Sequence, residues 1–127
     1  ITVNIDVVPN PQYWDIWTTA PFGTTVWAHR PLAVMNLSLA YRSGAPWNES
    51  AYANPALDDL LTRAEAIPDP VARSEVMAEI ERLMQEEGPI VQTYWRKLLT
   101  FMDDRVMGFE MHPTYQVFAN RIALRPA

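Results

Sequence analysis

Alternating apolar and polar side chains open the chain and predict a strand. In residues 1–8, isoleucine and valine occupy positions 1, 3, 5 and 7, while positions 2, 4 and 6 are polar. This period of two is typical of a strand with one buried face. Further runs rich in β-branched, aromatic or other apolar residues predict strands at 24–28, 90–94, 98–102 and 117–124, with an extended segment at 106–111.

Asparagine or aspartate followed by proline marks the expected start of three helices, at Asn10, Asn54 and Asp69. The side-chain oxygen of such a residue caps the first turn, and a proline at the first helical position loses no hydrogen bond. A fourth helix is expected from Pro31, because Leu32, Met35 and Leu39 follow helical spacing. It should end at Ser43-Gly44, and the aperiodic residues 45–53 should form an ordered loop.

The helices that start at Asn54 and Asp69 carry clean apolar stripes, which predicts that they pack on each other. The second of them should end at Gly88-Pro89. The residues expected in the contact are Leu57, Leu60, Leu61, Val76, Met77, Ile80, Leu83 and Met84.

The order of these elements predicts one mixed α/β domain over residues 1–127. The chain has 127 residues, of which 49% are hydrophobic and 20% charged, a composition that excludes intrinsic disorder. Its first residue is Ile1, within a strand-like run, so we expect a processed chain or a piece of a larger one.

The net charge limits the possible partners of the chain, and the absence of cysteine limits its possible chemistry. The formal net charge of −5 argues against a nucleic-acid partner or an anionic membrane surface. The absence of cysteine excludes disulfides, thiolate zinc sites and cysteine nucleophiles.

Enzyme motifs are missing from the sequence. His29 and His112 stand far apart without metal-ligand spacing, so we expect no metal site. With four glycines there is no phosphate-binding loop or dinucleotide motif, and no serine lies in a nucleophile elbow. We therefore expect no catalytic residues and no cofactor.

Aromatic residues give the strongest functional signal. Trp27 ends a predicted strand, Arg30 lies between that strand and the next helix, and Trp47 stands beside Asn48 in the irregular loop. Aromatic walls with a few polar groups are typical of a small-molecule cleft. The guanidinium could pair with a carboxylate or stack on a ring.

Several short motifs, taken in order, resemble the C-terminal part of the family 5 extracellular solute-binding proteins, which serve peptide, nickel and oligosaccharide ABC importers. The residues that carry the resemblance are Trp27 to Pro31, Trp47 to Ser50, Tyr52 to Leu61, Asp69 to Arg73 and Glu86 to Val91. In this family the ligand is captured between two lobes, and the closed form docks on the membrane permease.

This resemblance implies the fold and the partners. The fold would be a C-terminal lobe fragment of a periplasmic binding protein of type II-like fold, a mixed sheet with flanking helices. The implied partners are a small-molecule ligand (a peptide, a sugar or a conjugate), an ABC permease and the missing N-terminal lobe of the same protein. The implied location is periplasmic, or extracellular with a lipid anchor.

The candidate ligand-binding residues are Trp27, His29, Arg30, Trp47 and Asn48. Peptide binders of the family carry an aspartate after W-x-A, which pairs with the peptide's amino group, whereas this chain has His29 and Arg30. A positive group there favours an anionic or neutral polar ligand.

Two other interpretations remain open at this point. The chain could be a small freestanding enzyme that uses Arg30, His29 and an acid such as Asp15. It could also be an interaction domain that buries its aromatic residues against a partner chain.

Overall fold

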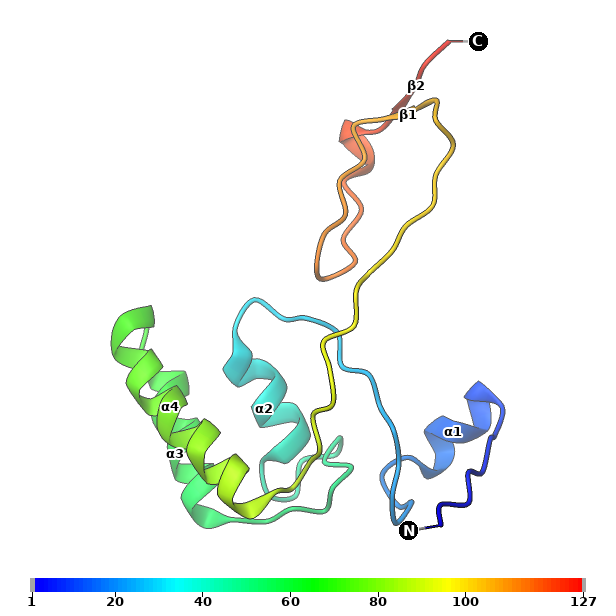
Figure 1. Ribbon diagram of the computed structural model, residues 1–127. Helices are drawn as coiled ribbons and strands as arrows, with labels where there is room; N and C mark the ends of the chain where they lie inside the picture. Colours follow the sequence, from blue (N-terminus) through cyan, green and yellow to red (C-terminus); the bar gives the residue numbers. More distant parts are fainter. Residues whose placement is uncertain (1, 127) are drawn as a thin grey trace.

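A computed structural model describes residues 2–126 and is mainly helical (Figure 1). Its elements in chain order are α1 (Asn10–Ile16), α2 (Ala33–Tyr41), α3 (Pro55–Ala66), α4 (Pro70–Glu87), β1 (Val106–Met107), the 3₁₀ helix η1 (Ala119–Arg121) and β2 (Ala123–Leu124). Helices α2, α3 and α4 lie together, whereas α1 and the C-terminal β1–β2 segment extend away from them (Figure 1). Within residues 2–126, no helix is both long and apolar enough to cross a membrane.

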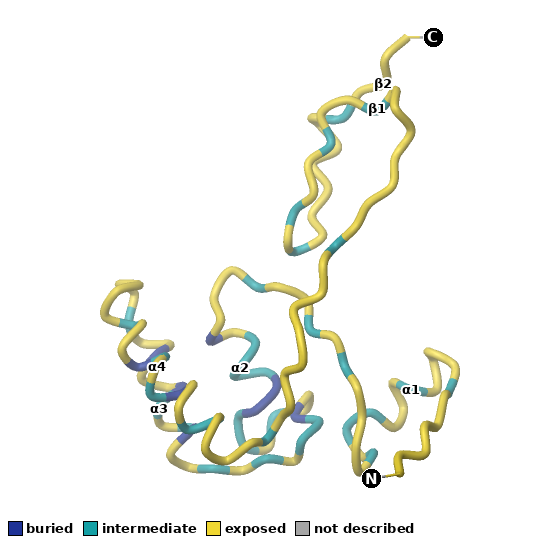
Figure 2. Tube along the Cα trace, viewed as in Figure 1, coloured by how far each residue is buried: buried dark blue, intermediate teal, exposed yellow. Residues whose placement is uncertain are grey.

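The core sits between α2, α3 and α4, where Figure 2 shows the buried positions. The buried apolar residues are Val34, Ala40, Tyr41, Leu57, Leu61, Ala64, Val76 and Ile80. Partly buried Leu60, Met77, Leu83 and Met84 pack against them. The predicted contact between the helices that start at Asn54 and Asp69 is therefore confirmed.

Both predicted caps of these helices are also confirmed. The side chain of Asn54 accepts a hydrogen bond from the backbone N–H of Ala56 at 2.8 Å. That of Asp69 accepts one from Ala72 at 2.7 Å. Gly88 ends α4 in the left-handed conformation with φ of 59°, which glycine adopts without steric cost.

Removing the Asp69 cap should destabilise the packed helices α2, α3 and α4, which we call the helical unit. We expect Asp69→Ala to lower the free energy of unfolding by about 0.5–2 kcal/mol, because a helix N–H loses its acceptor. Asp69→Asn keeps that acceptor and should recover most of the loss. Urea unfolding followed by circular dichroism measures both, with Asp6→Ala at an exposed site as the control. Equal midpoints for Asp69→Ala and Asp6→Ala would contradict the capping role.

The first two helices differ from the sequence prediction. Asn10 is not the N-cap of α1: Pro9 holds that position, and its carbonyl closes the first turn by accepting from Tyr13 N–H at 3.0 Å. In α2 the expected face is wrong, because Leu32 and Met35 are 40% and 41% exposed. The buried residues of α2 are instead Val34, Ala40 and Tyr41. Burial along α2 therefore follows its contact with α3 and not the spacing of Leu32, Met35 and Leu39.

Most predicted strands do not form. Within residues 2–126, the segments 24–28, 90–94 and 98–102 and the described part of 1–8 have no regular secondary structure; Ile1 lies outside the described residues. Later in the chain, Val106 and Met107 pair antiparallel with Leu124 and Ala123, the only ladder in the described part. A strand needs a hydrogen-bonded neighbour as well as a suitable side-chain pattern, and these segments have none here.

These unpaired segments leave much apolar surface in water. Val7 is 85% exposed, Trp95 89% and Phe101 93%. The accessible surface of 10063 Å² is well above the roughly 6,900 Å² of a compact protein of this mass. The helical unit is packed, whereas the extended segments lack covering partners.

Candidate functional site

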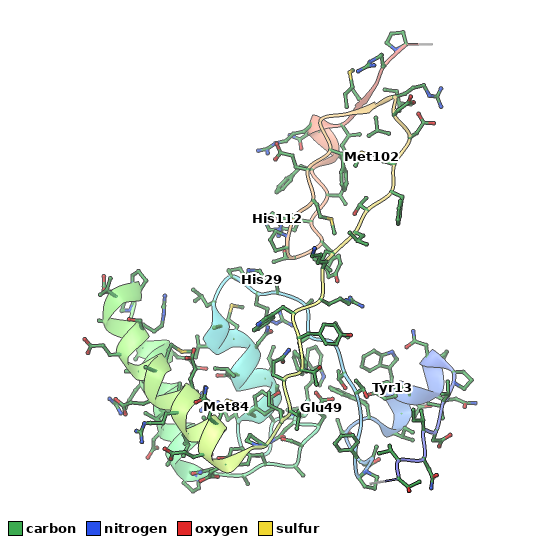
Figure 3. The ribbon with its side chains drawn as sticks, in the orientation of Figure 1. Tyr13, His29, Glu49, Met84, Met102 and His112 are labelled. Carbon is green, nitrogen blue, oxygen red and sulfur yellow. The ribbon has the colours of Figure 1, made fainter. Side chains whose placement is uncertain are left out.

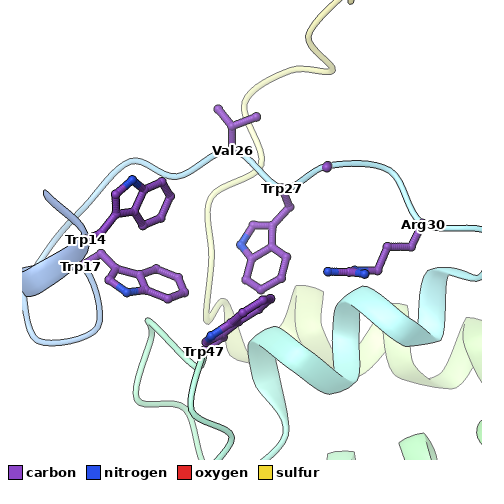
Figure 4. Close-up of a pocket in the computed structure, with 7 residues that line it drawn as sticks. Trp14, Trp17, Val26, Trp27, Arg30 and Trp47 are labelled. Carbon is purple, nitrogen blue, oxygen red and sulfur yellow. The ribbon is translucent and has the colours of Figure 1, made fainter. Parts of the chain in front are cut away.

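Four tryptophans make a continuous row of ring contacts between α1 and the loop that follows α2 (Figure 4). The ring centroids of Trp14 and Trp17 are 5.5 Å apart and their planes cross at 76°. Trp17 lies 6.5 Å from Trp27, which lies 6.0 Å from Trp47. Edge-on and tilted pairs at these distances are attractive, so the ring contacts help to stabilise the row.

The row lines a cavity of about 350 Å³ that is open to solvent. Its lining comprises Trp14, Trp17, Val26, Trp27, Ala28, Arg30 and Trp47. In Figure 4 the guanidinium of Arg30 points toward the rings of Trp27 and Trp47. A mainly apolar hollow with one cationic group at its edge is suited to a small molecule with an apolar part and a polar part.

Glu49 ties the walls of the cavity together. Its carboxylate accepts a hydrogen bond from the indole N–H of Trp27 at 3.0 Å and a short one from the Thr25 hydroxyl. The hydroxyl of Tyr13, on α1, lies 2.7 Å from that of Thr25. This relay joins α1, the extended segment before α2 and the loop after it.

The same carboxylate also acts on the core. Burial, and then the negative charge of Glu49, raise the pKa of Tyr41 to about 12. The shift moves the titration of Tyr41 further above physiological pH, so its hydroxyl keeps its proton well into the alkaline range.

Three of the five candidate ligand residues meet in this cavity: Trp27, Arg30 and Trp47. His29 is exposed on the connecting segment and does not line it (Figure 3). Asn48 is buried, and its amide group makes hydrogen bonds within the loop that follows α2. It donates to the carbonyls of Arg42 and Tyr52 at 3.2 and 2.7 Å and accepts from the Ser50 hydroxyl.

Trp14, Trp17 and Glu49 belong to the site, and the sequence reasoning did not select them. Trp14 and Trp17 are three positions apart, which puts both on one face of a short helix. This spacing could have indicated from the sequence that the two rings lie side by side. Glu49 gave no local signal, because its partners Thr25 and Trp27 lie more than twenty positions earlier.

His29 lies on the segment that precedes α2, and His112 lies between β1 and η1 (Figure 3). Across residues 2–126, no group of three or more histidine, cysteine, aspartate or glutamate side chains could hold a metal ion.

Removing the Glu49 carboxylate should loosen the cavity. Glu49→Ala leaves the Trp27 indole N–H and the Thr25 hydroxyl without their acceptor, so we expect a loss of about 1–3 kcal/mol of stability and a red shift of tryptophan fluorescence. Glu49→Gln keeps one acceptor oxygen and should show a smaller change. The exposed Glu81→Ala is the matched control. Identical emission spectra for Glu49→Ala and Glu81→Ala would rule out this role.

Comparison with known proteins agrees with a binding function at a coarse level. No family model matches the chain. Over 74 residues, 58% of the chain, it is 28% identical to the dipeptide-binding protein DppE of Bacillus subtilis (strain 168). The match spans 14% of that protein's length. The relative is a binding protein rather than an enzyme, which supports the resemblance to solute-binding proteins for part of the chain.

Proposed function

We propose that this chain is part of an extracellular solute-binding protein that captures a small ligand and delivers it to the permease of an ABC importer. The observation that carries the proposal is the cavity, in which Trp27, Arg30 and Trp47, all selected as ligand residues, come together. The partial match to a dipeptide-binding protein supports the same class of function. The proposed location is periplasmic, or extracellular with a lipid anchor.

The proposed fold is a lobe of a type II-like binding protein with a mixed sheet. Residues 2–8 and 98–102 keep the apolar side chains of strands but lack hydrogen-bonded neighbours. In this proposal the other lobe supplies the neighbouring strands and covers the apolar surface. The ligand then lies between the lobes, with the tryptophan row as one wall.

The proposed ligand is anionic or neutral and polar. Arg30 contributes a permanent positive charge to the cavity lining. A ligand ammonium group there would meet repulsion, while a carboxylate, a sugar or an amino-acid–sugar conjugate would find a hydrogen-bond donor.

Uptake and binding together test the function. A strain that lacks the gene should lose accumulation of a labelled ligand, and the gene for the Trp47→Ala variant should restore it poorly. Calorimetric titration of the protein that carries this sequence with peptides, sugars and amino-acid–sugar conjugates would identify the ligand class. Normal uptake in the deletion strain, together with no binding in the titrations, would overturn the proposal.

A further inference from the structure

The walls of the cavity are flat and aromatic, which restricts the shape of an occupant. Four indoles supply most of the lining, and Trp14 and Trp47 remain 51% and 47% exposed at its edge. Indole rings attract other rings in stacked or edge-on arrangements at the spacings found between the tryptophans themselves. A flat ring would therefore extend the existing row and cover indole surface that now faces water.

Arg30 supplies the polar half of the recognition. Its Nε atom is buried and has no hydrogen-bond partner among the described residues; Asn36 Oδ1 is the other such side-chain atom. A buried donor without an acceptor costs free energy, which an acceptor on a ligand would recover. Glu49 bonds to Trp27 and Thr25 and makes no hydrogen bond with Arg30 Nε.

We propose that the cavity binds a small carboxylate that carries a flat aromatic ring, an inference that rests on the solute-binding role proposed above. The ring lies among Trp17, Trp27 and Trp47, and the carboxylate accepts hydrogen bonds from the Arg30 guanidinium. The planar fork of Arg30 matches the two oxygens of a carboxylate. A ring with a short acid side chain is small enough for a cavity of about 350 Å³.

Three matched probes test this ligand class: phenylacetate, phenylacetamide and acetate. The purified protein that carries this sequence is titrated with each probe, and binding is followed by calorimetry and by quenching of tryptophan fluorescence. We expect phenylacetate to bind about tenfold or more tightly than phenylacetamide, because only the acid forms a charged pair with Arg30. Acetate, which lacks the ring, should also bind about tenfold or more weakly.

Variants separate the two halves of the site. Arg30→Met should reduce phenylacetate binding about tenfold or more and phenylacetamide binding by much less, because the amide carbonyl loses only a hydrogen bond and no charged pair. Arg125→Met removes the same charge in the C-terminal segment, outside the lining, and should change neither. Trp47→Ala should weaken both ring-bearing probes, whereas Trp95→Ala, at an exposed residue outside the lining, should not.

Equal affinities for phenylacetate and phenylacetamide, or equal losses of both in Arg30→Met, would overturn the inference. A dialanine titration in the same series separates this failure from failure of the proposed function. Dialanine binding that Trp47→Ala abolishes, without phenylacetate binding, would reject the aromatic carboxylate and keep the solute-binding role. No response to phenylacetate by the folded protein would overturn the aromatic carboxylate, while the solute-binding role is then decided by the titrations with sugars and conjugates described above.

Discussion

Leu61→Ala is expected to lower the free energy of unfolding by about 3–5 kcal/mol, the largest stability effect in this chain. Leu61 is 0% exposed and lies on α3 in the core that α2 and α4 complete. Truncation removes buried methyl groups and leaves a cavity that surrounding helices fill only partly. The loss approaches the whole stability of a small domain, so the helical unit should unfold at low urea concentration.

Urea unfolding followed by circular dichroism measures the effect, and Leu99→Ala is its matched control. Leu99 loses the same atoms but is 74% exposed, so its substitution should change stability by less than about 0.5 kcal/mol. Similar midpoints for the two variants would mean that α3 and α4 do not form the core in solution. If Leu61→Ala does not fold, Leu61→Met should still fold, with a loss of less than about 1.5 kcal/mol.

Arg30→Asp is expected to reverse the charge preference of the cavity and to abolish binding of carboxylate ligands. Two unit charges 4 Å apart interact by about 4 kcal/mol at an effective dielectric constant near 20, before desolvation is subtracted. Replacing attraction by repulsion therefore outweighs modest differences in the fit of ligand shape. Arg30→Ala, which only removes the charge, should lower the affinity without creating a preference for cations.

Calorimetric titration with unmodified peptides, sugars and amino-acid–sugar conjugates measures this preference. Arg125→Asp makes the same change of charge away from the cavity lining and serves as the control. Tight binding of an unmodified peptide that is insensitive to Arg30 substitution would contradict the prediction. It would mean that the guanidinium turns away from the ligand.

Local signals predicted the helices well because the physics of a helix start is local. Asn54 and Asp69 bond to backbone N–H groups two and three residues away, so their role is visible in a short stretch of sequence. The burial of α2 depended instead on which side meets α3, which its own spacing did not reveal.

Strands and the site depend on distant partners, which limits prediction from one sequence. The alternation in residues 1–8 reports which side chains could share a face, but it does not provide a neighbouring strand. Trp27, Arg30 and Trp47 were selected from aromatic content and from the family resemblance, and the fold brings them to one cavity. Asn48 was selected in the same way, yet its amide serves the turns of the loop.

The confinement of the core to α2, α3 and α4 has a calorimetric consequence. Heat capacity rises on unfolding by about 12–15 cal/mol/K per residue, because newly exposed apolar groups order water. A chain of 127 residues packed throughout would give about 1.5–1.9 kcal/mol/K, but residues 33–88 alone would contribute about 0.7–0.8 kcal/mol/K. The chain should therefore melt with the thermodynamic profile of a protein less than half its size, with a shallow dependence of stability on temperature.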